Sequence, residues 1–264
     1  MHIFFRIIPK LAFALGGRNV VRTAYICICL WVVLIGTEIF CISFGVRIPC
    51  VYKGLSFYFF CHSKADIAVL REVFLLEEYV WPQIENPKII IDLGAHVGDT
   101  ALFYHASYPN ARIYAVEPDP ESFRLLQINT KDFEKITPIH AAITKETGVL
   151  TLYVSAQSSL RGSTIKREKT TKEITVPALC LSDLYAQYSI SKADLIKFDI
   201  EGGEQDMFGS LGPEAYATAY IGEFHSDLTK STPEVFVSLF NVFDVRMEPM
   251  GRNKRFKIQA IKKH

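Results

Sequence analysis

Short apolar runs that end in glycine or acidic residues recur along the chain from residue 89 onward. The clearest is Ile89–Ile91, which continues through Asp92 to a break at Gly94. An unbroken apolar run of this kind predicts a strand buried on both faces, as in a parallel sheet. Gly98 then opens a predicted helix over residues 99–104, so the whole segment reads as a strand, a glycine turn and a helix.

Comparable apolar runs follow along the chain, and amphipathic segments such as residues 120–128 lie between them. Alternating strands and helices predict an α/β domain with a mostly parallel sheet. We predict its other strands at residues 111–116, 136–142, 194–200, 217–223, 243–247 and 256–261.

Residues 149–154 and 174–179 have the pattern of a hairpin inserted between two core strands. A polar and basic segment, residues 161–169, joins these strands. It is either a lid that holds an anionic substrate or a solvated hairpin loop, and the pattern does not separate the two.

The segment before the core is expected to form a small β-hairpin and one helix. Residues 47–60 predict the hairpin, with its turn near residue 53. Apolar residues spaced along 67–74 predict one buried helix face, and Ser63 and Asp66 are suited to cap the start of this helix.

The N-terminal part contains an almost uniformly apolar stretch, residues 24–44, which reaches the ~20 residues that cross a bilayer. Glu38 within it would cost roughly 2–3 kcal/mol at the bilayer centre. The basic residues Arg6, Lys10, Arg18 and Arg22 precede it. Three interpretations stay open: a signal anchor, a helix lying in the membrane surface, or a core or interface helix. We therefore divide the chain into residues 1–46, 47–86 and 87–264, the last being the main domain.

The composition narrows the possible partners. The 264 residues suit one α/β domain with an N-terminal extension. The 29 Lys and Arg and 28 Asp and Glu leave a net charge of +1, which argues against a nucleic-acid partner. The six cysteines include no Cys-x-x-Cys pair, so we expect reduced, mostly buried thiols of an intracellular protein and no metal ligands among them.

An acidic cluster is expected where the predicted strand 194–200 ends, because Asp199, Glu201 and Glu204 follow one another closely there. Carboxylates that lose hydration at a strand end favour a binding or reacting site. The alternative is a solvated helix N-terminus, in which Glu201 and Glu204 complement the helix dipole.

A second pair of acidic residues points to a nucleoside. Glu117 follows Asp92 by 25 residues, near the spacing at which an acid on the second strand binds ribose hydroxyls. A dinucleotide fingerprint would need Gly-x-Gly-x-x-Gly, but the corresponding residues are Gly94, His96 and Asp99. Asp99 would also place negative charge near the phosphates. The pattern therefore favours an adenosyl ligand without phosphates, and S-adenosylmethionine fits.

With these motifs the chain resembles the FkbM family of class I S-adenosylmethionine-dependent methyltransferases, over about residues 48–247. The resemblance rests on Ile91–Gly98, Val116–Pro118, Leu181–Leu184 and Lys197–Glu204. One departure is His96, where the family often carries Asn. The resemblance implies a Rossmann-like α/β fold with a mostly parallel seven-stranded sheet, helices on both faces and an N-terminal helical and hairpin extension.

The resemblance also implies methyl transfer to a hydroxyl of a sugar, glycolipid or secondary metabolite. The residues expected to bind the cofactor S-adenosylmethionine are Asp92, Gly94, His96, Gly98, Glu117, Ala141 and Ala142. A hydroxyl nucleophile needs a general base, for which Asp199 and His225 are the candidates, and Glu201 is the third predicted catalytic residue. His225 is a candidate because an unperturbed histidine titrates near neutrality. Asp199, Glu201 and His225 would suit a divalent metal if the fold brought them together, but their spacing is no established metal motif, so we predict no metal site.

Two other classes of function are weighed against the methyltransferase. One is a noncatalytic, membrane-tethered nucleotide-binding scaffold, and the other is an NAD-dependent oxidoreductase. Because the methyl donor is made and kept in the cytosol, we expect a cytoplasmic catalytic domain, whether or not residues 24–44 attach it to a membrane.

Overall fold

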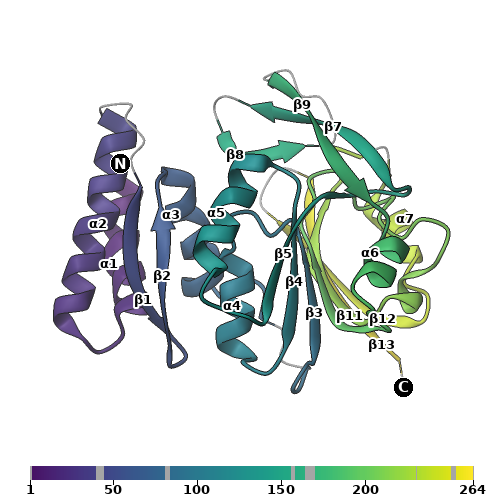
Figure 1. Cartoon of the computed structure of the whole chain (residues 1–264), viewed down its shortest axis with the longest axis horizontal. Coiled ribbons are helices and arrows are strands. Elements are labelled where there is room, and N and C mark those ends of the chain that lie inside the picture. Colours follow the sequence, from purple (N-terminus) through teal and green to yellow (C-terminus); the bar gives the residue numbers. More distant parts are fainter. Residues whose placement is uncertain are drawn as a thin grey trace.

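A seven-stranded sheet forms the centre of the molecule (Figure 1). The computed structural model of the protein describes residues 2–39, 45–80, 84–155, 158–163, 170–229, 231–250 and 254–263. The strand order of the sheet is β12-β13-β11-β10-β3-β4-β5. Its strands are β3 Ile89–Leu93, β4 Arg112–Glu117, β5 Ile136–His140, β10 Ala193–Phe198, β11 Ala217–His225, β12 Phe243–Met250 and β13 Arg255–Lys262. β13 runs antiparallel to β11 and β12, and the other neighbouring pairs are parallel, so the predicted sheet is confirmed.

Helices cover both faces of this sheet, as Figure 1 shows. One face packs against α4 (Asp99–Ser107) and α5 (Pro120–Thr130), and the other against α6 (Leu181–Gln187) and α7 (Pro233–Ser238). A short 3-10 helix, Pro213–Ala215, precedes β11. Neighbouring strand residues point to opposite faces, so Ile90 joins the apolar cluster on the α4 side while Ile91 joins the cluster on the α6 side. Both faces are apolar because both are covered, which explains the unbroken runs in the sequence.

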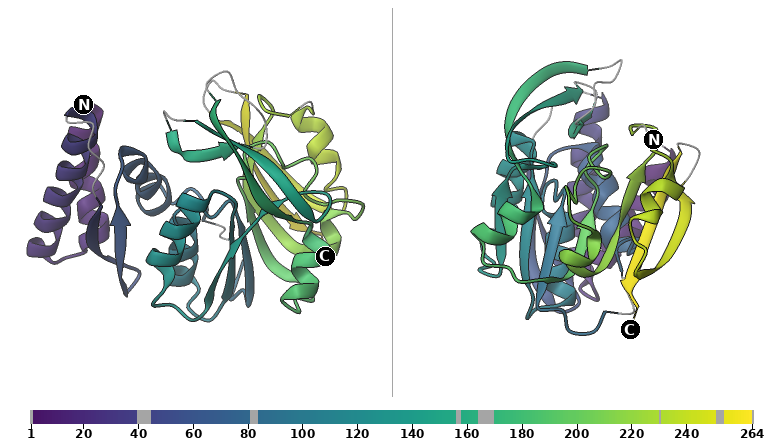
Figure 2. Two further views of the ribbon diagram at one scale, coloured as in Figure 1. Left: turned by 45° about the horizontal axis from the view of Figure 1, so that its top comes forward. Right: turned by 90° about the vertical axis from the view of Figure 1, so that its right-hand side faces the viewer.

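A second, four-stranded sheet lies beside one end of the first (Figures 1 and 2). It consists of β6 Ala142–Ile143, β7 Gly148–Ser155, β8 Ser158–Ser163 and β9 Thr170–Leu179. The antiparallel pairing of β7 with β9 confirms the predicted hairpin insertion. The prediction of one strand over residues 136–142 is wrong at its end, because Ala142 and Ile143 pair with β9 and leave the main sheet. Of the segment 161–169, for which a lid and a solvated hairpin loop were the two interpretations, residues 161–163 belong to β8 and residues 164–169 lie outside the described residues.

The N-terminal extension forms a helical hairpin against a β-hairpin (Figure 2). Its elements are α1 His2–Gly16, α2 Val20–Ile39, β1 Val46–Tyr52 and β2 Leu55–Cys61. α1, which contains Pro9, was not predicted as a helix. The buried residues Leu11 and Leu15 of α1 and Leu30 and Val33 of α2 belong to the same apolar cluster as α4.

α2 has two different faces. Residues Val20–Thr37 are long and apolar enough to cross a membrane by length and composition, yet only 33% of this stretch is buried. The exposed apolar side chains recur at helical spacing: Val21, Tyr25, Ile28, Val32 and Ile35. The packed face fits the interpretation as a core helix, and the exposed face leaves a second contact surface. The side chain of Glu38 lies outside the described residues.

The helix after the β-hairpin begins as predicted. α3 spans Lys64–Leu70 and continues into a π-helix, Arg71–Leu75. Ser63 and Asp66 form a capping box, in which the Ser63 hydroxyl accepts from the Asp66 backbone N–H and the Asp66 carboxylate accepts from the Ser63 N–H.

Asn129 joins the N-terminal extension to the main sheet. Its Oδ1 accepts from the Phe60 N–H at 2.7 Å, and its Nδ2 donates to the Val97 carbonyl at 2.8 Å. Phe60 belongs to β2 and Val97 to the turn between β3 and α4. One buried side chain therefore connects the hairpin to the glycine turn.

Asn129→Ala is expected to lower the free energy of unfolding by about 2 kcal/mol, because it leaves a backbone donor and a buried backbone acceptor without their partner. Urea unfolding followed by circular dichroism measures the change. The matched control is Asn110→Ala at an exposed position, expected to stay within about 0.5 kcal/mol of the wild type. Equal stabilities of both variants would contradict this role of Asn129.

Candidate active site

The carboxyl ends of β3, β4, β10 and β11 border one cavity, at the edge of the sheet where open α/β folds bind ligands. Its wall includes seven of the predicted site residues: Gly94, His96, Glu117, Ala141, Ala142, Asp199 and Glu201. Three other predicted residues, Asp92, Gly98 and His225, lie outside this wall, and Asp92 and His225 are fully buried behind it. The structure thus brings together segments that are a hundred residues apart in the sequence.

Glu117 at the end of β4 is held in place by two backbone donors. The His96 N–H donates to its Oε2 at 2.8 Å, and the Asp119 N–H donates to its Oε1 at 2.8 Å. The residue is 7% exposed and lines the cavity. Burial raises its pKa to about 7, against the opposing effects of His96 and the two N–H groups. A fixed carboxylate of this kind is suited to accept hydrogen bonds from a ribose diol.

Gly94 is required where β3 meets β10. Its φ is +75°, and a Cβ at this position would lie 1.9 Å from the Asp199 carbonyl oxygen. A side chain is therefore excluded both by backbone conformation and by space. The close approach brings the glycine turn and the acidic cluster to the same cavity.

A buried ion pair lies beneath this turn. Lys197 Nζ lies 3.1 Å from Asp92 Oδ1 and donates to the Gly94 carbonyl at 2.7 Å, and the Thr100 hydroxyl donates to Asp92 Oδ2 at 2.5 Å. Burial alone would lower the pKa of Lys197, but the carboxylate of Asp92 keeps it above its usual value. The predicted contact of Asp92 with the donor stays a prediction. Asp92 contacts the cavity only indirectly, through its ion pair with Lys197, which lines the wall.

Ala141 and Ala142 lie in the cavity wall near the apolar side chains of Ile143 and Leu152. Small and apolar residues leave room for a flat ring, as expected for the adenine end of the site. Their role in binding adenine stays a prediction.

The His96 side chain, which is 15% exposed, lies in the same wall, at a residue with φ of +49°. Its Nδ1 lies 3.6 Å from Asp99 Oδ1, and in the described part of the chain neither ring nitrogen has a hydrogen-bond partner. Burial would lower the pKa of His96, but Asp99 raises it. The ring thus offers polar atoms beside the glycine turn, and the predicted contact of His96 with the cofactor stays a prediction.

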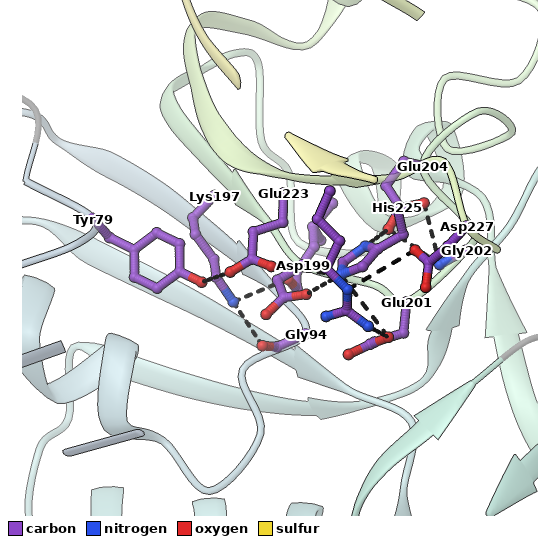
Figure 3. Close-up of polar contacts among 12 residues, drawn as sticks. Tyr79, Gly94, Lys197, Asp199, Glu201, Gly202, Glu204, Glu223, His225 and Asp227 are labelled. Atoms are coloured by element: carbon purple, nitrogen blue, oxygen red, sulfur yellow. Dashed lines mark hydrogen bonds and ion pairs between the residues drawn. The ribbon is translucent and has the colours of Figure 1, made fainter. Parts of the chain in front are cut away.

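His225 lies at the centre of the acidic cluster (Figure 3). Its Nδ1 is 2.6 Å from Glu204 Oε1. Its Nε2 is 3.5 Å from Glu223 Oε2, 3.6 Å from Asp199 Oδ1 and 3.9 Å from Glu201 Oε2. Burial would lower the pKa of His225, but these carboxylates raise it to about 10. A histidine that holds its proton at neutral pH is a poor general base, so of the two candidates Asp199 is favoured.

The acidic turn itself differs from the alternative that the sequence left open. Residues 201–210 form successive turns and no helix begins at Glu201, so the two glutamates do not complement a helix dipole. Glu204 is fully buried and accepts from the Gly202 N–H at 3.1 Å. Glu201 lies 3.5 Å from the Arg255 guanidinium.

Sequence reasoning missed three residues of the wall. Glu223 lies two residues before the end of β11, beside the other acids, a position that the strand-end argument could have included. Lys197 stands within the signature motif, but nothing in the pattern showed that its ammonium is buried. Tyr79, whose hydroxyl donates to Glu223 Oε1 at 3.2 Å, comes from a loop that carries no sequence signal (Figure 3).

Comparison with known proteins places the chain in a family. Residues 92–245 match the family described as Methyltransferase FkbM domain. The chain is 24% identical over 175 residues to Methyltransferase 1 of Beauveria bassiana, covering 58% of this chain and 70% of that protein. It is 26% identical over 173 residues to the 31-O-demethyl-FK506 methyltransferase FkbM of Streptomyces tacrolimicus, covering 53% and 66%. It is also 23% identical over 160 residues to the 2-O-methyltransferase NoeI of Sinorhizobium fredii, covering 54% and 66%.

Because the family match covers more than half of the sequence, the chain belongs to the FkbM family of class I S-adenosylmethionine-dependent methyltransferases. This decides against the NAD-dependent oxidoreductase. The cavity fits the donor, since it offers a fixed carboxylate for the ribose at Glu117, a cradle at Gly94 that a Cβ would fill and an apolar wall at Ala141.

We expect the affinity for S-adenosylhomocysteine to depend on the charge of Glu117. Its pKa of about 7 means that the carboxylate becomes protonated as the pH falls through neutrality, and a protonated oxygen is a weaker acceptor for the ribose. Calorimetry should show about tenfold weaker binding at pH 6 than at pH 8. Glu117→Gln should bind weakly at both values, with no such difference, and a wild-type pH profile in this variant would contradict the assignment.

Proposed function

We propose that the chain transfers the methyl group of S-adenosylmethionine to a hydroxyl oxygen of a sugar, glycolipid or secondary metabolite. The observation that carries this proposal is the row of carboxylates from Asp199, Glu201 and Glu223 in the cavity wall. Carboxylates accept hydrogen bonds from hydroxyls and can take their protons. Two similar proteins have names that specify O-methylation, the FkbM and NoeI methyltransferases described above.

The donor and the acceptor would occupy different ends of the cavity. Glu117 ends β4 and Asp199 follows β10, with β3 between these strands. Two strand spacings separate the two carboxylates by about 10 Å along the sheet edge. The ribose would therefore be bound at one end, with the acceptor near Asp199 at the other.

In this proposal the residues of the chain mainly bind and orient. S-adenosylmethionine supplies an electrophilic methyl group on a cationic sulfonium. Glu117 accepts hydrogen bonds from the ribose, and the turn at Gly94, fixed by Lys197, contacts the methionine portion. The acceptor hydroxyl loses its proton as its oxygen gains the methyl group, and Asp199 is the carboxylate proposed to receive that proton.

We further propose that the exposed face of α2 rests on a membrane surface, with the catalytic domain in the cytosol. Five apolar side chains form one stripe on this helix, from Val21 to Ile35. Exposed basic residues of the same helical hairpin, Arg6, Lys10 and Arg18, suit anionic lipid headgroups. A surface position would bring the cavity near a lipid-linked acceptor.

The first test of function is product identification. Cell extract incubated with isotopically labelled S-adenosylmethionine and the purified chain should yield a labelled methyl ether, identified by mass spectrometry and NMR. Label on nitrogen or carbon would overturn the proposed hydroxyl acceptor. A chain that binds the donor but labels no product in any extract would favour the noncatalytic scaffold.

Asp199→Asn should lower turnover on this acceptor at least about 100-fold, because the amide cannot take the proton. The affinity for S-adenosylhomocysteine should stay within about threefold of the wild type, since the ribose is bound elsewhere. The control is Asp206→Asn, an exposed residue of the same acidic turn, expected to retain wild-type turnover. Wild-type turnover in Asp199→Asn would exclude this residue as the base.

Membrane docking predicts that the chain sediments with vesicles containing anionic lipid. Ile28→Asp with Val32→Asp should release it, because the two charges would enter the apolar layer. Val149→Asp with Leu211→Asp, at exposed positions remote in sequence from α2, is the matched control and should still sediment. Equal sedimentation of both variants, or none by the wild type, would refute the docking face.

A further inference from the structure

The two nitrogens of His225 have different surroundings. Nδ1 lies 2.6 Å from a Glu204 oxygen, and Glu204 is itself fully buried and fixed by the Gly202 N–H. This arrangement sets the ring orientation and places the ring N–H on the Glu204 side. The other nitrogen, Nε2, is thereby aimed away from Glu204 and toward the acidic cluster (Figure 3).

Nε2 is surrounded by oxygens that are too far for hydrogen bonds. Among the residues that the structure describes it has no hydrogen-bond partner, although His225 is fully buried. The nearest carboxylate oxygens, from Glu223, Asp199 and Glu201, lie at 3.5, 3.6 and 3.9 Å. Asp199, Glu201 and His225 each offer one possible ligand atom, and these three atoms lie within 4.8 Å of one another.

We infer that Asp199, Glu201 and His225 bind a divalent first-row transition-metal ion at the acceptor end of the cavity. Bonds of 2.0–2.2 Å from one ion to these ligands place neighbouring ligand atoms roughly 3–4 Å apart. The distances from His225 Nε2 to Asp199 Oδ1 and Glu201 Oε2, 3.6 and 3.9 Å, lie in this range. The buried Glu204 behind Nδ1 is the carboxylate partner that metal-binding histidines typically have.

Charge supports the same site. Four carboxylates, from Asp199, Glu201, Glu204 and Glu223, converge on one imidazole. The nearby cations among the described residues are Arg255, beside Glu201, and Lys197, which is already paired with Asp92. Buried like charges repel strongly unless a cation offsets them. One imidazole nitrogen with carboxylate oxygens suits Mn²⁺, Fe²⁺ or Zn²⁺ better than Mg²⁺, which prefers oxygen ligands alone.

The role of the ion rests on the proposed function. Asp199 and Glu201 line the cavity, so an ion between them would have an open position toward the acceptor. A hydroxyl oxygen bound there would release its proton more readily. As the oxygen gains the methyl group, the O–H bond breaks and the proton passes to the second oxygen of Asp199, while the electron pair of the sulfur–carbon bond stays on sulfur.

The test is Mn²⁺ binding to the full chain. The chain is first treated with a chelator, and the free Mn²⁺ is then measured by electron paramagnetic resonance as the ion is added. We expect one saturable site per chain, with competition by Zn²⁺. Glu201→Gln and His225→Gln should each weaken Mn²⁺ binding at least tenfold. Glu204→Gln, which removes a positioning residue, should weaken it about 10–100-fold. Asp206→Asn, in the same turn but exposed, should bind as the wild type does.

Two outcomes would overturn the site: no saturable Mn²⁺ binding in the wild type, or unchanged binding in both Glu201→Gln and His225→Gln. Either would leave His225 as a protonated ion-pair partner of the acids. Folding of each variant is checked by S-adenosylhomocysteine binding, and should His225→Gln fail this check, Glu201→Gln decides alone. Failure of the proposed function can be told apart from failure of the metal site. In that case the chain would bind Mn²⁺ but form no methyl ether.

Discussion

A lysine ammonium buried between two neighbouring parallel strands holds the glycine turn of the cavity in place. Lys197 of β10 pairs with Asp92 of β3 and donates to the Gly94 carbonyl at the start of the glycine turn. Burying two charges is expensive, and only a close partner with further hydrogen bonds compensates for it. Here Thr100 and the Gly94 carbonyl supply those bonds. The turn that lines the cavity is therefore fixed from beneath by an interaction that the ligand need not touch.

The cavity has two electrostatically different ends, and this division suits a transfer reaction. At one end Glu117 is a single carboxylate held by two N–H groups, with small apolar residues nearby. At the other end several acids gather around one histidine. A nucleoside needs the first kind of surface, whereas a neutral polyhydroxyl compound is better held by the second.

The sequence predicted the framework well because strands buried on both faces are readable as apolar runs. It also predicted which strand ends meet, since parallel strands bring their carboxyl ends to one edge, and this brought Glu117 and Asp199 to one cavity. It did not predict that Asp92 lies behind the wall, because a strand pattern does not show that this carboxylate pairs with Lys197. Nor could it show the surroundings of the two His225 nitrogens, which depend on how Glu204 and Glu223 fold around the ring. Tyr79 was missed because long loops reach a site without any periodic signal.

Asn129 has a consequence for how the parts of the molecule communicate. Its amide joins β2 of the N-terminal extension to the turn that carries His96. A displacement of the extension would therefore move the turn whose His96 N–H orients the Glu117 carboxylate. The β-hairpin of the extension is thus mechanically linked to the turn that carries His96, and a shortened chain that lacks β2 would lose a brace of that turn.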